Sequence, residues 1–514
     1  MRIFRNTCMA FILAVMFIAF ITGTSYALDK KELIILHTND MHGQVYPYYF
    51  KQMGAYYGGL SNLAAKINQL REEYGSDKIL LIDAGDVSQG TPVSNIFQGD
   101  PMTDYMNYVH YDCTTFGNHE FDWGQKALLR QVQRRHFPTV CANVIETATG
   151  QVPAGVKPYI VVERAGMKIG IIGVATPSTP RMSFHKNVEG LEFLDSVETI
   201  NKYREELNKQ GIKVIGVVSH NGYKEDLDIA SKVNGITFII GGHSHTPVYN
   251  PYMVNGIPVC QAGEWGKFIG FERLKIDADT GKTLSFEGKL IHNIAGDEKL
   301  AKQLAPYKEK VDKSMNEVLG DLSADITHLE YQVKGSGTTS AGDVVTDIMK
   351  AVTGADVAFI NTHGIRASLP KGTITRGSVF TILPFDNALM TCEVKGSDLA
   401  KIIEYYVDRP SFTQVAGIKC DYDSKKPFEH RVTNIKINGK DLDPNKTYKI
   451  ATIDFLFGAS KDCKELQNAK NINTSKVLRD EVEAYIKQKK HIVVPEEIRI
   501  KVLNGNSPGE RKRH

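Results

Sequence analysis

The sequence predicts an α/β fold in which a layered sandwich domain is joined by a long helix to a smaller α+β domain. Continuous apolar, β-branched runs alternate with amphipathic helical stretches between Glu32 and about His292, as at Ile79–Ile82 and Val214–Val218. Runs of this kind suit strands that are buried on both faces of a sheet. A charged stretch without glycine, Glu298–Leu319, follows with apolar residues at helical spacing. Shorter strand-like and helical runs then alternate as far as Leu503.

The length and charge of the chain limit the classes of protein that it can be. Its 514 residues are enough for two or three domains with well-filled cores. Its 62 Lys and Arg residues nearly balance 59 Asp and Glu residues, so no large basic field arises. We therefore expect no nucleic-acid partner and no attraction to an anionic membrane.

The first 27 residues have the three parts of a secretory signal peptide. Arg2 and Arg5 precede an apolar run over Met9–Ile21, and small residues follow up to Ala27. This order predicts cleavage after Ala27 and a periplasmic or secreted protein. The alternative, a retained membrane anchor, needs about 20 apolar residues, more than this run supplies. No second run of that length follows, so we expect no stable membrane insertion after cleavage.

Six cysteines remain after the predicted cleavage. They are Cys113, Cys141, Cys260, Cys392, Cys420 and Cys463. An even number in an oxidising compartment permits disulfides, but the residues are scattered and form no CxxC pair. The sequence therefore argues against a structural zinc site and leaves bridges and buried free thiols as open alternatives.

The domain boundaries follow from these patterns. We predict a signal peptide over 1–27, a first domain over 28–296, a linker helix over 297–323, a second domain over 324–503 and a disordered tail over 504–514. Two hairpins are also predicted, one turning at Ala165-Gly166 and one at Asn438-Gly439.

Five short polar patches in the first domain each stand where a strand-like run ends. They are Asp40–Gly43, Gly85-Asp86, Gly117–Glu120, Ser219–Asn221 and Gly241–His245. Ligand sites of α/β sheets lie at the carboxyl edge of the strands, so these patches are expected to meet there. Their Asp, Asn and His side chains suit a pair of divalent metals. Such a pair can attack a phosphorus ester through a bound hydroxide, and hydrolysis is therefore the leading hypothesis.

The spacing within the patches suggests how the ligands are arranged. Asp40 and His42 stand two residues apart after a strand, and an extended backbone would direct both side chains to one face. His243 and His245 have the same spacing, and the two oxygens of Asp86 can bridge two metals. Each residue alone is also compatible with a solvated loop, and His220 with an ordinary core or surface histidine. The prediction of a metal site therefore depends on the occurrence of all five patches in one domain.

The third patch separates a ligand from a catalyst. Asn118 offers a neutral carbonyl oxygen to a metal, while its neighbour His119 points elsewhere and stays free. Asp122 lies three residues further on, near enough to fix the tautomer of that imidazole and favour its protonated state. The alternative is a polar turn that caps a helix.

These motifs resemble those of a known family. Leu36–Gly43, Gly85-Asp86, Gly117–Glu120 and Gly241–His245 are similar to the motifs of secreted 5'-nucleotidases and UDP-sugar hydrolases, which are calcineurin-like metallophosphoesterases. Asn361–Arg366 and Leu383–Asn387 resemble the C-terminal substrate-binding segment of that family. The resemblance covers nearly the whole mature chain. It identifies the predicted sandwich as a metallophosphoesterase domain.

The resemblance implies a role for each candidate residue. One metal would be held by Asp40, His42, Asp86 and His245, and a second by Asp86, Asn118, His220 and His243. His119 with Asp122 would form the catalytic dyad. Arg366 and Arg409 would bind the substrate phosphate, and Phe412 would stack on the base. Ligands of these types suit Zn, Mn, Fe or Co.

The chain departs from the family where the base is recognised. A second stacking ring normally follows a Gly-Gly-Asp-Gly turn, but here that turn is absent and Cys463 stands near the ring position, with Phe457 as a possible substitute. His363 also replaces an expected glycine in the substrate loop. The metal chemistry is therefore better supported than the nucleotide specificity.

We expect an exported dinuclear-metal phosphohydrolase that acts on nucleoside 5'-monophosphates, a small-molecule substrate, through a metal-bound hydroxide. Within the same enzyme class, hydrolysis of UDP-sugars or 2',3'-cyclic nucleotides and thiosulfohydrolase chemistry stay open, because the base pocket is altered. A non-catalytic secreted binding protein is the alternative from another class.

Overall fold

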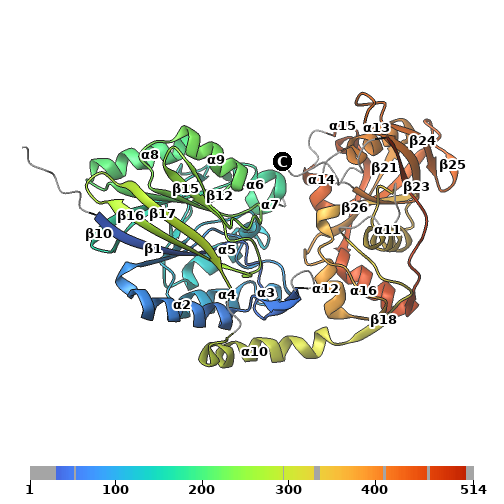
Figure 1. Cartoon of the computed structure of the whole chain (residues 1–514). Helices are drawn as coiled ribbons and strands as arrows, with labels where there is room; N and C mark the ends of the chain where they lie inside the picture. The colour runs from blue at the N-terminus through green and yellow to red at the C-terminus, as the bar shows by residue number, and fades with distance from the viewer. Residues whose placement is uncertain are drawn as a thin grey trace, which may run out of the picture.

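The computed structural model describes residues 30–50, 54–183, 185–292, 295–328, 336–408, 413–459 and 463–504. Figure 1 shows two α/β domains, with one long helix running below the N-terminal domain and leading toward the C-terminal one. The predicted signal peptide and residues 505–514 lie outside the described residues. Among the described residues, no helix has the length and apolarity needed to cross a membrane.

Two mixed sheets face each other in the N-terminal domain. The first has the order β17 (Lys282–Ile291), β16 (Ile269–Asp277), β1 (Lys30–Thr38), β4 (Ile79–Asp83), β5 (Cys113–Thr114), β6 (Thr139–Val140) and β8 (Val156–Lys157). The second has the order β14 (Tyr252–Val254), β15 (Ile257–Cys260), β13 (Phe238–Gly241), β12 (Val214–His220), β10 (Met167–Ala175) and β9 (Tyr159–Arg164). Parallel pairing from β1 to β4 and β5, and from β10 to β12 and β13, brings the carboxyl ends of these strands together.

Helices cover both outer faces, which confirms the predicted layered sandwich. Helices α2 (Leu60–Tyr74) and α4 (Asp100–Tyr108) pack on the first sheet, and α8 (Ser196–Lys209) and α9 (Tyr223–Lys232) on the second. A third apolar cluster lies between the sheets, where Leu33 and Ile35 of β1 meet Ile169 and Ile171 of β10. Burial on both faces explains why these strands are continuous apolar runs.

Both predicted hairpins are present. Strand β9 turns into β10 at Ala165-Gly166, where φ is 54° and 70°. Strand β24 (Val432–Ile437) turns into β25 (Lys440–Asp441) at Asn438-Gly439, where φ is 50° and 80°. Two successive left-handed residues match the right-handed twist of the paired strands, which is why Asn-Gly is favoured there.

The linker helix is shorter than predicted. Helix α10 (Glu298–Met315) begins at Asp297, whose side chain accepts a hydrogen bond from the backbone N–H of Leu300. Val318–Leu322 is not helical but forms strand β18, which pairs with β20 (Gly372–Thr375). The predicted helix end at 323 is therefore wrong. Val318 fits the helical spacing but is 59% exposed, so it does not belong to the apolar face of the helix.

The C-terminal domain has a core of its own. Its main sheet has the order β22 (Thr413–Ala416), β19 (Val357–Asn361), β26 (Thr447–Ile453), β21 (Ala388–Lys395) and β27 (Lys470–Val477). A smaller sheet has the order β25, β24, β23 (Ile418–Asp423) and β29 (Ile500–Asn504), and β18 lies between β20 and β28 (His491–Ile492). Helices α11 (Ser340–Thr353), α12 (Arg376–Ile382), α13 (Gly396–Val407) and α16 (Leu478–Lys489) pack against these strands.

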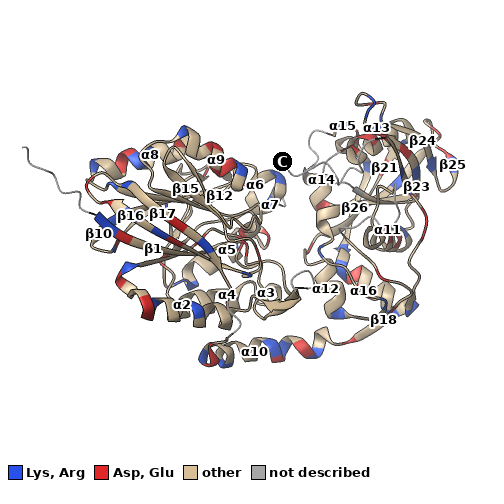
Figure 2. Cartoon of the chain, in the orientation of Figure 1, with Lys and Arg blue, Asp and Glu red and all other residues tan. Residues whose placement is uncertain are grey.

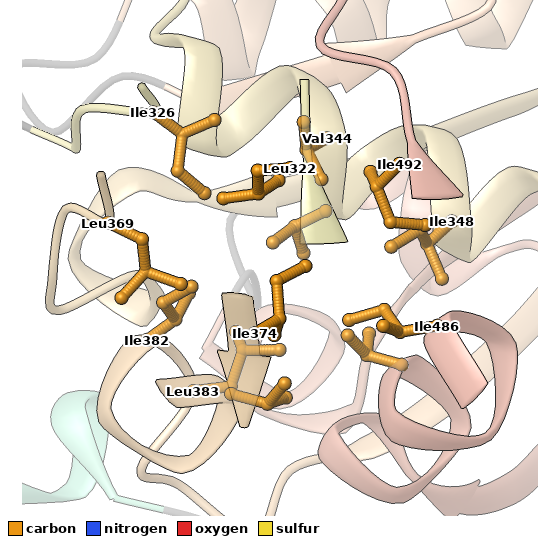
Figure 3. A pocket seen from close by; sticks show the side chains of 13 residues that line it. Leu322, Ile326, Val344, Ile348, Leu369, Ile374, Ile382, Leu383, Ile486 and Ile492 are labelled. Atoms are coloured by element: carbon orange, nitrogen blue, oxygen red, sulfur yellow. The ribbon is translucent and has the colours of Figure 1, made fainter. Parts of the chain in front are cut away.

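A small cavity lies within this core (Figure 3). It is lined only by Leu, Ile and Val side chains, such as Leu322 of β18, Val344 of α11 and Ile486 of α16. A site of this composition has no group that could orient a polar ligand. We interpret it as imperfect packing of the core.

The six cysteines after the predicted cleavage point are all buried free thiols, so the alternative of disulfide bridges is not realised. Figure 2 shows basic and acidic residues interspersed on both domains, in agreement with the near balance of charge.

Candidate metal centre

The five polar patches follow β1, β4, β5, β12 and β13 and meet at the carboxyl edge of the two sheets. Two groups of side chains there could each hold a metal ion, with their ligand atoms within 4.8 Å of one another. The first group is Asp40, His42, Asp86 and His245, and the second is Asp86, His220 and His243. Asp86 belongs to both. Asn118 lies beside the second group, its Oδ1 2.9 Å from Nδ1 of His243.

The backbone that carries these ligands is turned rather than extended. The φ angles of Asp40, His42, Asp86, His243 and His245 are 50°, 46°, 53°, 79° and 55°. The extended backbone that we expected is therefore wrong for both pairs, although Asp40 and His42 do belong to one ligand group. His243 and His245 belong to different groups, as the family resemblance implies. Left-handed non-glycine residues are unfavourable and concentrate at functional sites.

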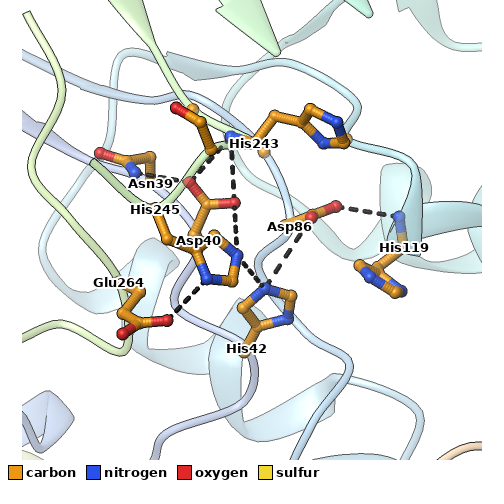
Figure 4. Close-up of polar contacts among 12 residues, drawn as sticks. Asn39, Asp40, His42, Asp86, His119, His243, His245 and Glu264 are labelled. Carbon is orange, nitrogen blue, oxygen red and sulfur yellow. Dashed lines mark hydrogen bonds and ion pairs between the residues drawn. The ribbon is translucent and has the colours of Figure 1, made fainter. Parts of the chain in front are cut away.

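Hydrogen bonds donated by Nδ1 set the tautomers of three of the histidines. Nδ1 of His42 donates to the carbonyl oxygen of Gln89 at 2.9 Å, and Nδ1 of His220 to that of Ala84 at 2.6 Å. Nδ1 of His245 donates to the carboxylate of Glu264 at 2.6 Å (Figure 4). In each neutral imidazole the lone pair is then on Nε2, which is the arrangement of metal-binding histidines.

The two groups fit a pair of divalent cations. Nε2 of His42 and Nε2 of His245 lie 3.0 Å apart, so two lone pairs face each other. Nε2 of His220 is buried and has no hydrogen-bond partner among the described residues, although Oδ2 of Asp86 is 3.1 Å away. Bound cations would accept these lone pairs and would balance the negative charge of the buried carboxylates. The mixed oxygen and nitrogen donors suit first-row transition metals.

His119 stands beside the ligand groups without belonging to either, and its ring centroid is 5.2 Å from that of His42. Its backbone N–H donates to Oδ1 of Asp86 at 2.9 Å, and its Nδ1 lies 2.7 Å from Oδ2 of Asp122. Burial lowers the pKa of His119, but the carboxylates of Asp122 and Asp86 outweigh burial, and the net pKa is raised. The imidazole is thus held in one orientation in which its protonated form is favoured.

Glu120 holds two of the ligand turns together, a role that the sequence does not reveal. Its buried carboxylate accepts hydrogen bonds from the backbone N–H groups of Asp86 at 2.9 Å, Val87 at 2.9 Å and Gly117 at 2.6 Å. A Cβ atom on Gly117 would lie 2.1 Å from Oδ1 of Asp86, so only glycine allows this approach. Glu120 thereby fixes the distance between the shared ligand and His119.

Replacing Glu120 with alanine is expected to lower the free energy of unfolding by roughly 2 to 4 kcal/mol, because three buried N–H groups lose their acceptor. Urea denaturation followed by fluorescence measures the change. The matched control is Glu205→Ala, which removes a carboxylate that is 63% exposed and should change stability little. Equal stability of the two variants would contradict the role given to Glu120.

The C-terminal domain completes the site. The ring of Phe385 stacks on His119, with centroids 5.6 Å apart and planes at 22°, and the guanidinium of Arg366 lies 5.8 Å from the Phe385 centroid. Asn95 links the domains by donating to the carbonyl oxygen of Pro384 at 2.7 Å. Burial lowers the pKa of Arg366, and the largest opposing effect comes from the carboxylate of Glu264. Arg366 therefore lies near the carboxylates of the metal centre.

The predicted base-binding residues have different outcomes. Arg409 and Phe412 lie outside the described residues. Cys463 is only 2% exposed and packs in the core of the domain. Phe457 is partly buried and packs against that core. Phe385 lies in the Leu383–Asn387 motif, but no sequence pattern distinguishes it from the other residues there.

Family models match both domains. A model of calcineurin-like phosphoesterases matches residues 33–247. A model of the 5'-nucleotidase C-terminal domain matches residues 318–465.

Relatives and solved structures extend the match to the whole architecture. Snake venom 5'-nucleotidase of Crotalus adamanteus is 30% identical, over 85% of this chain and 83% of the relative. Endonuclease YhcR of Bacillus subtilis is 30% identical over 83% of this chain, but the match spans only 37% of that protein. The crystal structure of a 5'-nucleotidase precursor from Thermus thermophilus superposes with a TM-score of 0.82 at 29% identity, covering 92% of this chain and all of that one. This chain therefore belongs to the 5'-nucleotidase family and is a metallophosphoesterase hydrolase of that family.

Proposed function

We propose that this protein is an exported 5'-nucleotidase that uses two divalent metal ions to release phosphate from nucleoside 5'-monophosphates. The observation that carries the proposal is the meeting of two ligand groups, joined by Asp86, with His119 and with Arg366 from the other domain. Hydrolysis of a phosphate ester needs groups that bind the phosphate, neutralise its charge and protonate the leaving oxygen. The two ligand groups, Arg366 and His119 can supply these functions together.

The chain's own residues have separable tasks. When bound, a pair of divalent ions supplies an activated water nucleophile and neutralises charge on phosphoryl oxygens. Asp86 fixes the two ligand groups relative to each other. Arg366 presents a planar guanidinium suited to two phosphate oxygens. His119, oriented by Asp122, donates a proton or a hydrogen bond to the leaving oxygen.

The base is expected to stack on an aromatic ring of the C-terminal domain. Phe412 stays the proposed ring from the sequence, with Arg409 as a further phosphate ligand, and Phe385 presents a second ring beside His119. Cys463 is buried and offers no ring of its own. This difference keeps UDP-sugars, 2',3'-cyclic nucleotides and thiosulfonate-type substrates as alternatives within the enzyme class.

A hydrolysis panel tests the substrate, with the nucleotide, nucleoside and inorganic phosphate products of each compound separated and measured. We expect AMP and other 5'-mononucleotides to be hydrolysed faster than UDP-glucose and cyclic nucleotides, and a chelator to abolish every rate. Faster turnover of UDP-glucose or of a cyclic nucleotide would reassign the substrate and leave the metal centre in place. No turnover of any nucleotide would reject the proposed activity.

Replacing Arg366 with alanine is expected to raise KM for AMP by roughly 10- to 100-fold, since a charge-assisted contact to phosphate contributes about 1.5 to 3 kcal/mol. Steady-state kinetics measure this, with Lys395→Ala as control, since Lys395 is an exposed cation on β21 of the same domain. An unchanged KM in the Arg366 variant would remove Arg366 from the substrate site.

The proposal of export is supported by the signal-peptide pattern of residues 1–27. N-terminal sequencing of the exported protein should find Leu28 as the first residue, and recovery of uncleaved protein with the membranes would contradict this.

A further inference from the structure

The metal-centre histidines differ in the group that accepts the hydrogen bond from Nδ1. Nδ1 of His42 and of His220 donates to an uncharged backbone carbonyl, whereas Nδ1 of His245 donates to the Glu264 carboxylate at 2.6 Å (Figure 4). A carboxylate behind an imidazole makes Nε2 a stronger donor and fixes the ring plane. The two ligand groups are therefore unequal, because His245 belongs to only one of them.

Glu264 is itself held firmly. Its second oxygen, Oε1, accepts a hydrogen bond from the Lys267 ammonium at 2.9 Å, and the side chains of Glu264 and Lys267 are only 21% and 12% exposed. The ammonium lies 4.2 Å from the ring centroid of Phe50 and 4.9 Å from that of Trp265. Two aromatic faces and a carboxylate thus surround one cation.

One of these aromatic residues, Trp265, is anchored to the metal centre. The backbone N–H of Trp265 donates to the carbonyl oxygen of Asp40 at 2.7 Å, in a left-handed conformation with φ of 57°. Tyr48 packs edge-on against the Trp265 ring at 5.5 Å. Bulky residues rarely adopt this conformation, so the surrounding contacts must impose it.

Lys267 also orients the carboxylate of Glu264. The hydrogen bond from Lys267 occupies Oε1 and leaves Oε2 directed at Nδ1 of His245.

We propose that Glu264, fixed by Lys267 against Phe50 and Trp265, is a positioning residue that makes the cation position of Asp40, His42, Asp86 and His245 the tighter of the two. This inference rests on the proposed metal pair and adds a difference in affinity between its members.

Titration of the chelator-treated full chain with Co²⁺ tests the inference, by calorimetry together with the visible absorption of the bound ion. Wild type should bind two ions with two distinct constants. Glu264→Gln keeps the size of the side chain but removes its charge, and should weaken the tighter constant by roughly 10- to 100-fold and alter its absorption. The control Asp228→Asn, which breaks an exposed carboxylate–lysine pair on α9, should leave both constants unchanged.

Two Lys267 variants provide an independent arm that does not depend on how Glu264→Gln folds. Lys267→Met should lower the affinity of the same tighter site. Lys267→Arg keeps the charge and the contact with aromatic rings, and should keep the wild-type affinity. A merely structural role would change thermal stability without this selective effect on one cation. In a His220→Ala background, which removes a ligand of the other position, Glu264→Gln should weaken the remaining tight site.

The outcomes separate the inference from the proposed function. Two Co²⁺ ions bound by wild type, with both constants unchanged in Glu264→Gln and in Lys267→Met, would overturn the inference and leave the metal pair standing. Failure of wild type to bind two ions would overturn the proposed metal pair, and with it this inference.

Discussion

Replacing His119 with alanine is expected to lower kcat for phosphate release from AMP by roughly 10²- to 10⁴-fold, the usual contribution of a positioned acid or base. His119 is next to the ligand groups but belongs to neither. Its loss should therefore remove the hydrogen bond to the leaving oxygen while metal binding persists. Initial rates and metal analysis of the same sample measure both effects.

Two further variants serve as control and comparison for His119→Ala. His136→Ala removes an exposed histidine of the same domain and should retain full activity. Asp122→Asn should give an intermediate rate, because the imidazole stays but loses the carboxylate that orients it. An unchanged rate in His119→Ala would refute the catalytic role, and loss of metal from that variant would make His119 a ligand instead.

Replacing Asp86 with asparagine is expected to have the largest effect on the metal centre, since Asp86 is the residue that both ligand groups share. The stabilisation that two ions give to a transition state amounts to several kcal/mol, so activity should fall by roughly 10³-fold or more. Metal analysis should find fewer than two ions per chain. Asp279→Asn, a change at an exposed aspartate, is the matched control.

Asparagine at this position keeps the shape of the side chain and an oxygen for the His119 backbone N–H. A fall in activity could then be ascribed to the lost charge rather than to a displaced turn. Full activity with two bound ions would show that the shared carboxylate is not needed.

Sequence alone predicted the strands and the position of the polar patches, because burial on both faces leaves a local pattern of consecutive β-branched residues. It could not predict the turns that carry Asp40, His42 and His243, since their left-handed angles depend on contacts with distant loops. The grouping of ligands came from the family resemblance, not from spacing. An argument from an extended backbone would have placed His243 and His245 on the same metal.

The supporting residues escaped prediction for a related reason. Glu120 and Glu264 act on groups brought to them by the fold, and the partner of Glu120 at Asp86 is 34 residues away in the chain. Phe385 meets His119 only because the two domains face each other. Val318 misled the helix prediction because its apolar side chain fits the helical spacing, although strand pairing determines its structure.

The most direct test of the central claim is the rate of AMP hydrolysis as cobalt ions are returned, one equivalent at a time, to chelator-treated protein. The structure predicts no phosphate release without metal and a rate that reaches its maximum at two ions per chain. Undiminished hydrolysis by metal-free protein, or no recovery after two equivalents, would contradict a two-metal centre built on Asp86.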